Sequence, residues 1–259
     1  MQYENILFTV GDDYVAEITL NRPAQLNTFT IPLAKELHQA LLEADGDSKV
    51  RVVIVKGAGK VFCAGIDVSF IPNKTVMEYR DWIECMGNPL FTISRMRKPV
   101  IAQVHGVAAA NGAGLVAAAD LAIAGEKARM GLTAINVGLN CVGPVIPVTR
   151  SVGRKKALEL LLFGELIPAQ EAQQMGLINR VVAEADLETE TRKWAALLAQ
   201  KSPVALQTAK KAFYAAADQE YGKAFDMMNE VFACLCATDD AKEGIAAFME
   251  KRPAVWSEK

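Results

Sequence analysis

The sequence is poor in the residues that build metal centres and disulfide frameworks. Its 259 residues include only two histidines, which lie far apart, and five scattered cysteines, an odd number. Neither a zinc-ligand spacing nor a paired-cysteine framework is present. We therefore expect no metal site, no redox function and no bound cofactor, in a reduced protein of the cytoplasm.

An excess of charge of one sign is also lacking, and so is a long apolar run. Lys and Arg number 28 against 30 Asp and Glu, which gives a net charge of -2. Basic clusters are short, so we expect no nucleic-acid partner. No run of 18 apolar residues occurs, so no membrane span is expected, and the start MQYENILFTV lacks the features of a targeting segment.

What is present is a stretch of small residues at 101–120, IAQVHGVAAANGAGLVAAAD. An apolar strand is expected to enter a Gly/Ala loop there, followed by a helix of small side chains. Small residues allow a ligand to lie against bare backbone, and N–H groups at a helix start can hold negative charge. The alternative is a tightly packed buried helix without a ligand, and this stretch alone does not decide between them.

The first half of the chain has the pattern of an α/β fold. A polar loop at 21–29 leads to Thr30, a plausible N-cap for a helix with an apolar face. Continuous apolar runs such as RVVIVK at 51–56 are typical of strands covered on both faces. The predicted strands are a hairpin of residues 3–10 and 14–21, then residues 51–56, 99–104 and 120–124.

The second half is predicted to be helical. Helices are expected at residues 155–164, 169–176, 187–200, 203–218, 221–237 and 239–251, with a short strand at 179–182. We divide the chain into an α/β core, residues 1–200, and a helical C-terminal oligomerisation region, residues 201–259. The apolar faces of the last helices indicate packing on another subunit.

Two glycine-bearing loops, residues 63–67 and 110–114, could carry chemistry. A dinucleotide fingerprint is missing, and GAGK at 57–60 is followed by Val61 rather than Ser or Thr, so a phosphate loop is not indicated. Two separate loops that each offer a free N–H to one point describe an oxyanion hole.

Four ordered motifs carry a resemblance to a known family. They are NRP-x-x-LN at 21–27, FCAG-x-D at 62–67, the HG-x-A…D block at 105–120, and AF-x-EKRP at 247–253. The chain resembles the crotonase superfamily, the enoyl-CoA hydratase/isomerase family, nearly from end to end. The resemblance implies a ββα spiral core, a C-terminal trimerisation region, an acyl-CoA substrate with coenzyme A as part of that substrate, and a homotrimer or a hexamer.

The same resemblance assigns site residues by motif position. The N–H groups of Ile66 and Asn111 would hold the thioester oxygen, and Asn111 stands where the family usually has glycine. Phe248 and Lys251 would meet the adenine and phosphates of a ligand in the same or in a neighbouring subunit, although Lys251 as a merely solvated charge is an equal alternative. Residues implied to line the coenzyme A channel are Ala24, Leu26, Ala64 and Asp67.

Both hydratase glutamates of the family are missing, because their positions hold Gly114 and Ala134. Hydration needs acid–base groups, so efficient hydratase activity is not expected. Glu84 is the best remaining candidate acid or base, since Asp67 is expected to fix its loop. The other polar residues near the expected site are Asn136, Asn140 and Cys141, of which Cys141 is expected to be a buried structural thiol.

Three functions remain open. The first is an enzyme that stabilises an enolate in decarboxylation or in a double-bond shift, and the second is a non-catalytic acyl-CoA-binding protein. The third is a structural trimer with an empty pocket. The sequence does not indicate the acyl group.

Overall fold

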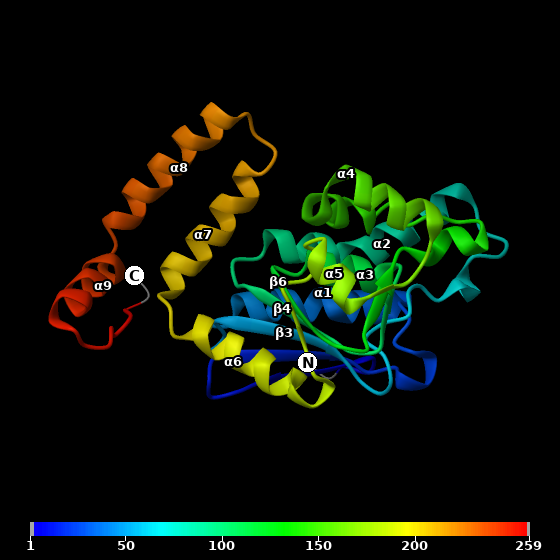
Figure 1. The fold of residues 1–259 in the computed structure, drawn as a ribbon, viewed down its shortest axis with the longest axis horizontal. Helices are drawn as coiled ribbons and strands as arrows, with labels where there is room; N and C mark the ends of the chain where they lie inside the picture. Colours follow the sequence, from blue (N-terminus) through cyan, green and yellow to red (C-terminus); the bar gives the residue numbers. More distant parts are fainter. Residues whose placement is uncertain (1–2, 258–259) are drawn as a thin grey trace.

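A computed structural model describes residues 3–257 of the chain. Its central sheet has six strands in the order β1-β2-β3-β4-β6-β9 (Figure 1). Only β1 and β2 pair antiparallel, as the predicted hairpin, and the other neighbours are parallel. The strands are β1 (Ile6–Val10), β2 (Val15–Leu20), β3 (Val52–Gly57), β4 (Val100–Val104), β6 (Leu121–Gly125) and β9 (Arg180–Val182).

Both faces of β3 are buried, which confirms the prediction from its unbroken apolar run. Val53 and Val55 belong to the large core cluster that includes the apolar side of α1 (Ile31–Gly46). Val52 and Ile54 pack on the other face with Ala195 of α6 (Leu187–Ala199). A strand between two helical layers has no polar face, so this part of the α/β prediction is confirmed.

A second sheet of three short strands was not predicted. It consists of β5 (Val107–Ala109), β7 (Arg129–Gly131) and β8 (Ile167–Pro168), in that order. Strands of two or three residues leave almost no periodicity in a sequence. This sheet leads directly into α3 (Asn111–Ala118), the helix of small residues.

The helix α2 (Val76–Arg95) was also missed, although Thr75 and Glu78 form a capping box at its start. The helix expected at 155–164 is longer, since α4 (Val145–Phe163) begins ten residues earlier and is interrupted at Gly153, where φ is +76°. The remaining short elements of the core are α5 (Ala169–Gln174) and the 3-10 turns Pro23–Gln25, Val68–Phe70, Thr133–Val137 and Glu184–Asp186.

The last three helices form an arm beside the core: α7 (Pro203–Ala216), α8 (Tyr221–Cys236) and α9 (Asp239–Glu250) (Figure 1). They confirm the predicted helical C-terminal region, and the predicted bounds agree with the observed ones within two residues. The division into units at residue 200 stays a prediction. None of the residues of α8 is buried.

Among residues 3–257 there is no helix with the length and hydropathy that a membrane crossing requires.

Candidate active site

The two glycine-bearing loops lie side by side. The Cys63 N–H donates to Val107 O at 3.0 Å, and the Ala109 N–H donates to Cys63 O at 2.9 Å. A side chain at Gly112 would overlap the carbonyl oxygen of Cys63. Glycine at position 112 is therefore needed for this close approach.

Each loop presents one backbone N–H that is not used inside the fold. Phe29 donates to Gly65 O at 2.8 Å and Asp67 donates to Phe29 O at 2.8 Å, while the Ile66 N–H between them meets no acceptor in the described part of the chain. Asn111 is the first residue of α3, and the first N–H groups of a helix have no intrahelical partner. Ile66 and Asn111 both line one cavity of about 280 Å³.

The backbone just before Asn111 is strained. Ala110 has φ +47° and ψ −112°, a conformation that an L-residue with a side chain rarely adopts. It is held by the hydrogen bond from its N–H to Gly131 O at 2.8 Å. Strain of this kind persists where the surrounding structure over-determines it, as it does at functional sites.

The 280 Å³ cavity, hereafter the thioester cavity, has almost no ionisable lining. Among the described residues that line it, Cys141 is the only one with an ionisable side chain, and burial raises the pKa of this thiol. Burial likewise raises the pKa of Cys63, in the first loop, to about 12. Neither thiol carries negative charge near neutral pH, which supports the expectation that Cys141 is structural.

The position of the first missing glutamate is closed by packing. A Cβ atom at Gly114 would lie 2.7 Å from Pro144 Cβ and 2.9 Å from Leu90 Cδ2. Ala134, at the second position, lines the thioester cavity. The position that the resemblance assigns to the first glutamate therefore has no space for a carboxylate side chain.

The side chain of Asn111 is held by α2 and is 3% exposed. Its Nδ2 donates to Met86 O at 3.0 Å. An asparagine side chain in place of the family's usual glycine would narrow the pocket or add a hydrogen-bond donor, and this Nδ2 donor is already used within the fold.

Of the polar candidates, Glu84, Asn136 and Asp67 lie outside the thioester cavity. Glu84 is exposed on α2 and does not line the cavity. Asn136 donates to Gly164 O at 2.8 Å. Hydrogen bonding to the Ser69 side chain and to the Ser69 N–H, the latter at 3.0 Å, lowers the pKa of the Asp67 carboxyl, which also lies 3.9 Å from Arg22. Asp67 therefore fixes its loop, whereas Asn140 lines the cavity.

Of the residues proposed for coenzyme A, some lie beside the thioester cavity and others lie far from it. Ala64 lines the cavity, and its N–H donates to Leu26 O at 3.0 Å, so the exposed Ala24 and Leu26 lie on the adjoining loop. Phe248 is 82% exposed on α9, and Lys251 follows that helix. Figure 1 shows α9 at the end of the arm, far from α3. Within one chain, these two residues do not join the others.

Sequence reasoning missed the role of Asn27 in the NRP-x-x-LN motif. Its buried Nδ2 donates to Ala58 O, Val61 O and Phe62 O at 2.9, 2.9 and 3.2 Å, and its Oδ1 accepts from the Arg22 N–H. A signal was present, because asparagine side chains in loops often hydrogen-bond backbone groups. Asn27 ties the first loop to the end of β3.

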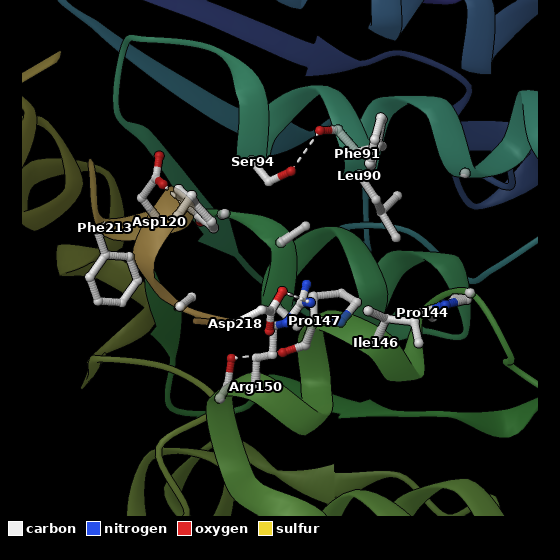
Figure 2. A pocket seen from close by; sticks show the side chains of 18 of the residues that line it. Leu90, Phe91, Ser94, Asp120, Pro144, Ile146, Pro147, Arg150, Phe213 and Asp218 are labelled. Carbon is white, nitrogen blue, oxygen red and sulfur yellow. Dashed lines mark hydrogen bonds and ion pairs between the residues drawn. The ribbon is translucent and has the colours of Figure 1, made fainter. Parts of the chain in front are cut away.

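A second and larger cavity, of about 880 Å³, adjoins the thioester cavity and is hereafter the chamber. Figure 2 shows Leu90 and Phe91 on one side of it, Ile146 and Pro147 on another, and Phe213 of α7 at one end. The chamber and the thioester cavity share four lining residues, Ile83, Asn111, Gly143 and Pro144.

Comparisons with known proteins agree with this geometry. The model of the family "Enoyl-CoA hydratase/isomerase" matches residues 11–259. The human mitochondrial enoyl-CoA hydratase domain-containing protein 3 is 35% identical over 246 residues, which cover 95% of this chain and 81% of that protein. The stretches INVGLNCVGP and GELIPAQEAQQMGLINRVV resemble that protein as well.

Solved structures give the same result. The enoyl-CoA hydratase of Mycobacterium smegmatis superposes with a TM-score of 0.95 at 35% identity, covering 98% of this chain and 99% of that one. Human enoyl-CoA hydratase domain-containing protein 3 superposes with a TM-score of 0.94 at 33% identity, covering 98% and 100%. The fold is therefore the crotonase fold. The chain belongs to the enoyl-CoA hydratase/isomerase family, and a cytoplasmic location stays a prediction.

Proposed function

We propose that the chain binds an acyl-CoA thioester and stabilises the negative charge of an enolate on the thioester oxygen. The observation that carries this proposal is that Ile66 and Asn111, whose N–H groups meet no acceptor in the described part of the chain, both line one cavity. Preorganised donors of this kind act where charge develops, and removal of one donor typically costs about 3 kcal/mol of transition-state stabilisation.

The lining of the thioester cavity favours decarboxylation. Hydration and double-bond shift both need a positioned acid or base, and the described lining residues supply none apart from the Cys141 thiol. In a 2-carboxyacyl-CoA, the bond from C2 to the carboxylate breaks, its electron pair enters the enolate, CO₂ leaves, and water protonates C2. The neutral side chains of Thr133 and Asn140 line the cavity and would face the departing carboxylate.

The test compares three ligands on the purified chain. Methylmalonyl-CoA is followed by mass spectrometry for propionyl-CoA, crotonyl-CoA by ultraviolet absorbance for hydration, and acetyl-CoA by calorimetry for binding. We expect binding and decarboxylation without appreciable hydration. Robust hydration would contradict the argument from the missing carboxylates.

The same lining favours a second candidate, a non-catalytic acyl-CoA-binding protein. A cavity that retains its N–H donors but lacks acids and bases can hold a thioester without changing it. Acetyl-CoA binding with no conversion of either methylmalonyl-CoA or crotonyl-CoA would establish this alternative. Absence of acetyl-CoA binding would exclude both candidates.

Restoring the two glutamates alone is expected to fail. The double substitution Gly114→Glu and Ala134→Glu places a side chain against Pro144 and Leu90, at the Cβ distances of 2.7 and 2.9 Å given above. We expect no crotonyl-CoA hydration and a melting temperature several degrees lower, since overpacking costs about 1–3 kcal/mol. Adding Pro144→Gly relieves the closest contact and should recover part of the stability and some hydration. Hydration by the double variant alone would show that the site opens more easily than its packing suggests.

We further propose that the arm assembles three copies, singly or as two stacked trimers. On α8, Phe225 and Phe232 are 58% and 67% exposed, and Phe248 of α9 is more exposed still. A helix that exposes large apolar side chains and has no buried residue is expected to pack against another protein surface. In such an assembly, Phe248 and Lys251 of one copy could reach the coenzyme A of another.

Assembly is tested by mass in analytical ultracentrifugation. We expect three or six times 28.0 kDa for the native chain. Phe225→Glu with Phe232→Glu should give a folded monomer, because each glutamate would be buried without a partner in the interface. Leu42→Glu, on the exposed side of α1, is the control and should leave the mass unchanged. A native mass of 28.0 kDa would overturn the proposal.

A further inference from the structure

The residues that follow α9 fold back along that helix. Lys251, at the C-cap of α9, has φ +53°, a left-handed conformation that reverses the direction of the chain. Arg252 then reaches back to Glu243 with two donors, at 2.6 and 2.9 Å, and the Val255 N–H donates to the same carboxylate at 2.8 Å. Residues 252–257, hereafter the strap, are therefore held along α9.

The strap leads to the junction between α6 and α7. Trp256 Nε1 donates to the carbonyl oxygen of Gln200, directly after α6, at 2.8 Å. The Ser257 N–H donates to Asp240 Oδ1 at 2.8 Å, and Asp240 Oδ2 accepts from the Ser202 hydroxyl at 2.6 Å. Ser202 is the N-cap of α7, so the strap and the start of α9 both meet the point where the arm leaves the core (Figure 1).

This contact is buried at its centre. Asp240 is 2% exposed and Ser202 is 7% exposed. A carboxylate is stable at such a depth only where its oxygens are hydrogen-bonded, and both of them are. The Trp256 ring lies against α9 at Gly244, where an added Cβ would be 3.4 Å from two ring carbons. The direction of α9 relative to α7 is therefore fixed at the junction.

That direction decides where the far end of α9 lies. Lys251 is 11 residues beyond Asp240. This separation is about 17 Å along a helix, so a rotation of about 15° around Asp240 would move Lys251 by about 4 Å. Such a displacement is longer than a hydrogen bond. Phe248 is exposed on the same helix, and within residues 3–257 the Lys251 ammonium group has no partner. Both side chains are therefore free to meet a ligand.

We propose that the strap positions the end of α9 that binds the nucleotide part of an acyl-CoA. By holding α9 at the junction, Trp256 sets the place where Phe248 and Lys251 meet the adenine and phosphates of a ligand bound to another copy of the chain. Trp256 is a positioning residue, because it acts through Lys251 and does not itself touch the thioester. The inference rests on the proposed function, which supplies the thioester site and the assembly of copies.

The test separates the nucleotide from the thioester by comparing acetyl-CoA with S-acetylpantetheine, which has the same thioester but no nucleotide. Dissociation constants are measured by calorimetry. A hydrogen bond from a charged group is worth roughly tenfold or more in affinity, so we expect the native chain to bind acetyl-CoA at least about tenfold more tightly. Trp256→Ala should largely remove this preference and leave S-acetylpantetheine binding within about twofold of native.

Val255→Ala is the matched control. Val255 lies next to Trp256, its side chain is 75% exposed, and its backbone N–H still donates to Glu243 in the variant. This substitution should change neither affinity. Trp256→Phe keeps a ring beside Gly244 but loses the donor to the Gln200 carbonyl, so it should retain part of the nucleotide preference. It also carries the comparison if Trp256→Ala does not fold.

Lys251→Ala shows whether Trp256 acts through α9. Alone, this substitution should weaken acetyl-CoA binding and leave S-acetylpantetheine binding unchanged. Added to Trp256→Ala, it should cause no further loss, because the effects of residues that act through one another are not additive. Two losses that add in full would show that the strap acts elsewhere, and would overturn the inference.

The outcomes separate this inference from the proposed function. If Trp256→Ala leaves the nucleotide preference intact, weakens both ligands equally or alters the mass of the assembly, the inference is overturned and the proposed function stands. If Lys251→Ala has no effect on the native chain, α9 does not meet the nucleotide; the inference is again overturned, while S-acetylpantetheine binding still supports the thioester site. If neither ligand binds, the proposed function itself fails.

Discussion

Replacing Asp120 by alanine is expected to lower the free energy of unfolding by about 3–5 kcal/mol, because it leaves a buried ammonium group without its partner. Lys210 Nζ lies 2.6 Å from Asp120 Oδ2 and also donates to Lys98 O at 2.8 Å. The lysine side chain is 7% exposed and the aspartate side chain 15%. Asp120 also accepts hydrogen bonds from the Val100 N–H and the Tyr214 hydroxyl, so one core carboxylate accepts from three groups, two of which belong to arm helix α7.

Urea denaturation followed by circular dichroism measures this loss. The control is Glu159→Ala, which removes the partner of Lys156 in an exposed i,i+3 pair and should cost less than about 1 kcal/mol. Adding Lys210→Met to Asp120→Ala removes both charges and should recover part of the stability, since an apolar side chain is not penalised by burial. A cost for Asp120→Ala no larger than that of the control would show that water reaches Lys210.

A phenylalanine at position 111 is expected to reduce turnover at least 100-fold without unfolding the chain. Asn111 is 3% exposed and lines both the thioester cavity and the chamber. A large ring there keeps the acyl group away from the N–H groups of residues 66 and 111, and loss of one such donor typically costs about 10²–10³-fold in rate. The rate of methylmalonyl-CoA conversion is measured for the variant and the native chain. If the native chain does not convert it, the affinity for acetyl-CoA is measured instead.

Asn111→Gly is the matched control for this substitution. Both variants lose the hydrogen bond from Asn111 Nδ2 to Met86 O, but only the phenylalanine obstructs the cavity, and glycine retains the backbone N–H. We expect Asn111→Gly to keep most of the native turnover or binding. Equal loss in both variants would assign the effect to the side-chain hydrogen bond with α2 and would contradict a role for the N–H.

Local patterns in the sequence were sufficient for much of the fold. The unbroken apolar run of β3 indicated that both of its faces are buried. Thr30 is the N-cap of α1, as predicted, and its side chain accepts a hydrogen bond from the Leu33 N–H. The helices of the arm follow their apolar periodicity closely. These features depend on residues within a few positions of one another, which is the range that periodicity and capping rules describe.

The site was predictable only in part. The motifs placed Ile66 and Asn111 in two loops, and the structure brings both to one cavity. The motifs also drew attention to Glu84, yet the unpredicted helix α2 carries it to the solvent. The orientation of a residue on a helix depends on which face packs against the core, and that face was not identified for residues 76–95.

By itself, the sequence determined the α/β class, the helical arm and the family. The tertiary structure alone decided that Pro144 closes the space beside Gly114, that Lys210 reaches Asp120 across 90 positions, and that the thioester cavity and the chamber share lining residues. The physical reason is the separation along the chain. Local propensities act between near neighbours, whereas close packing and buried ion pairs depend on which distant side chains the fold brings into contact.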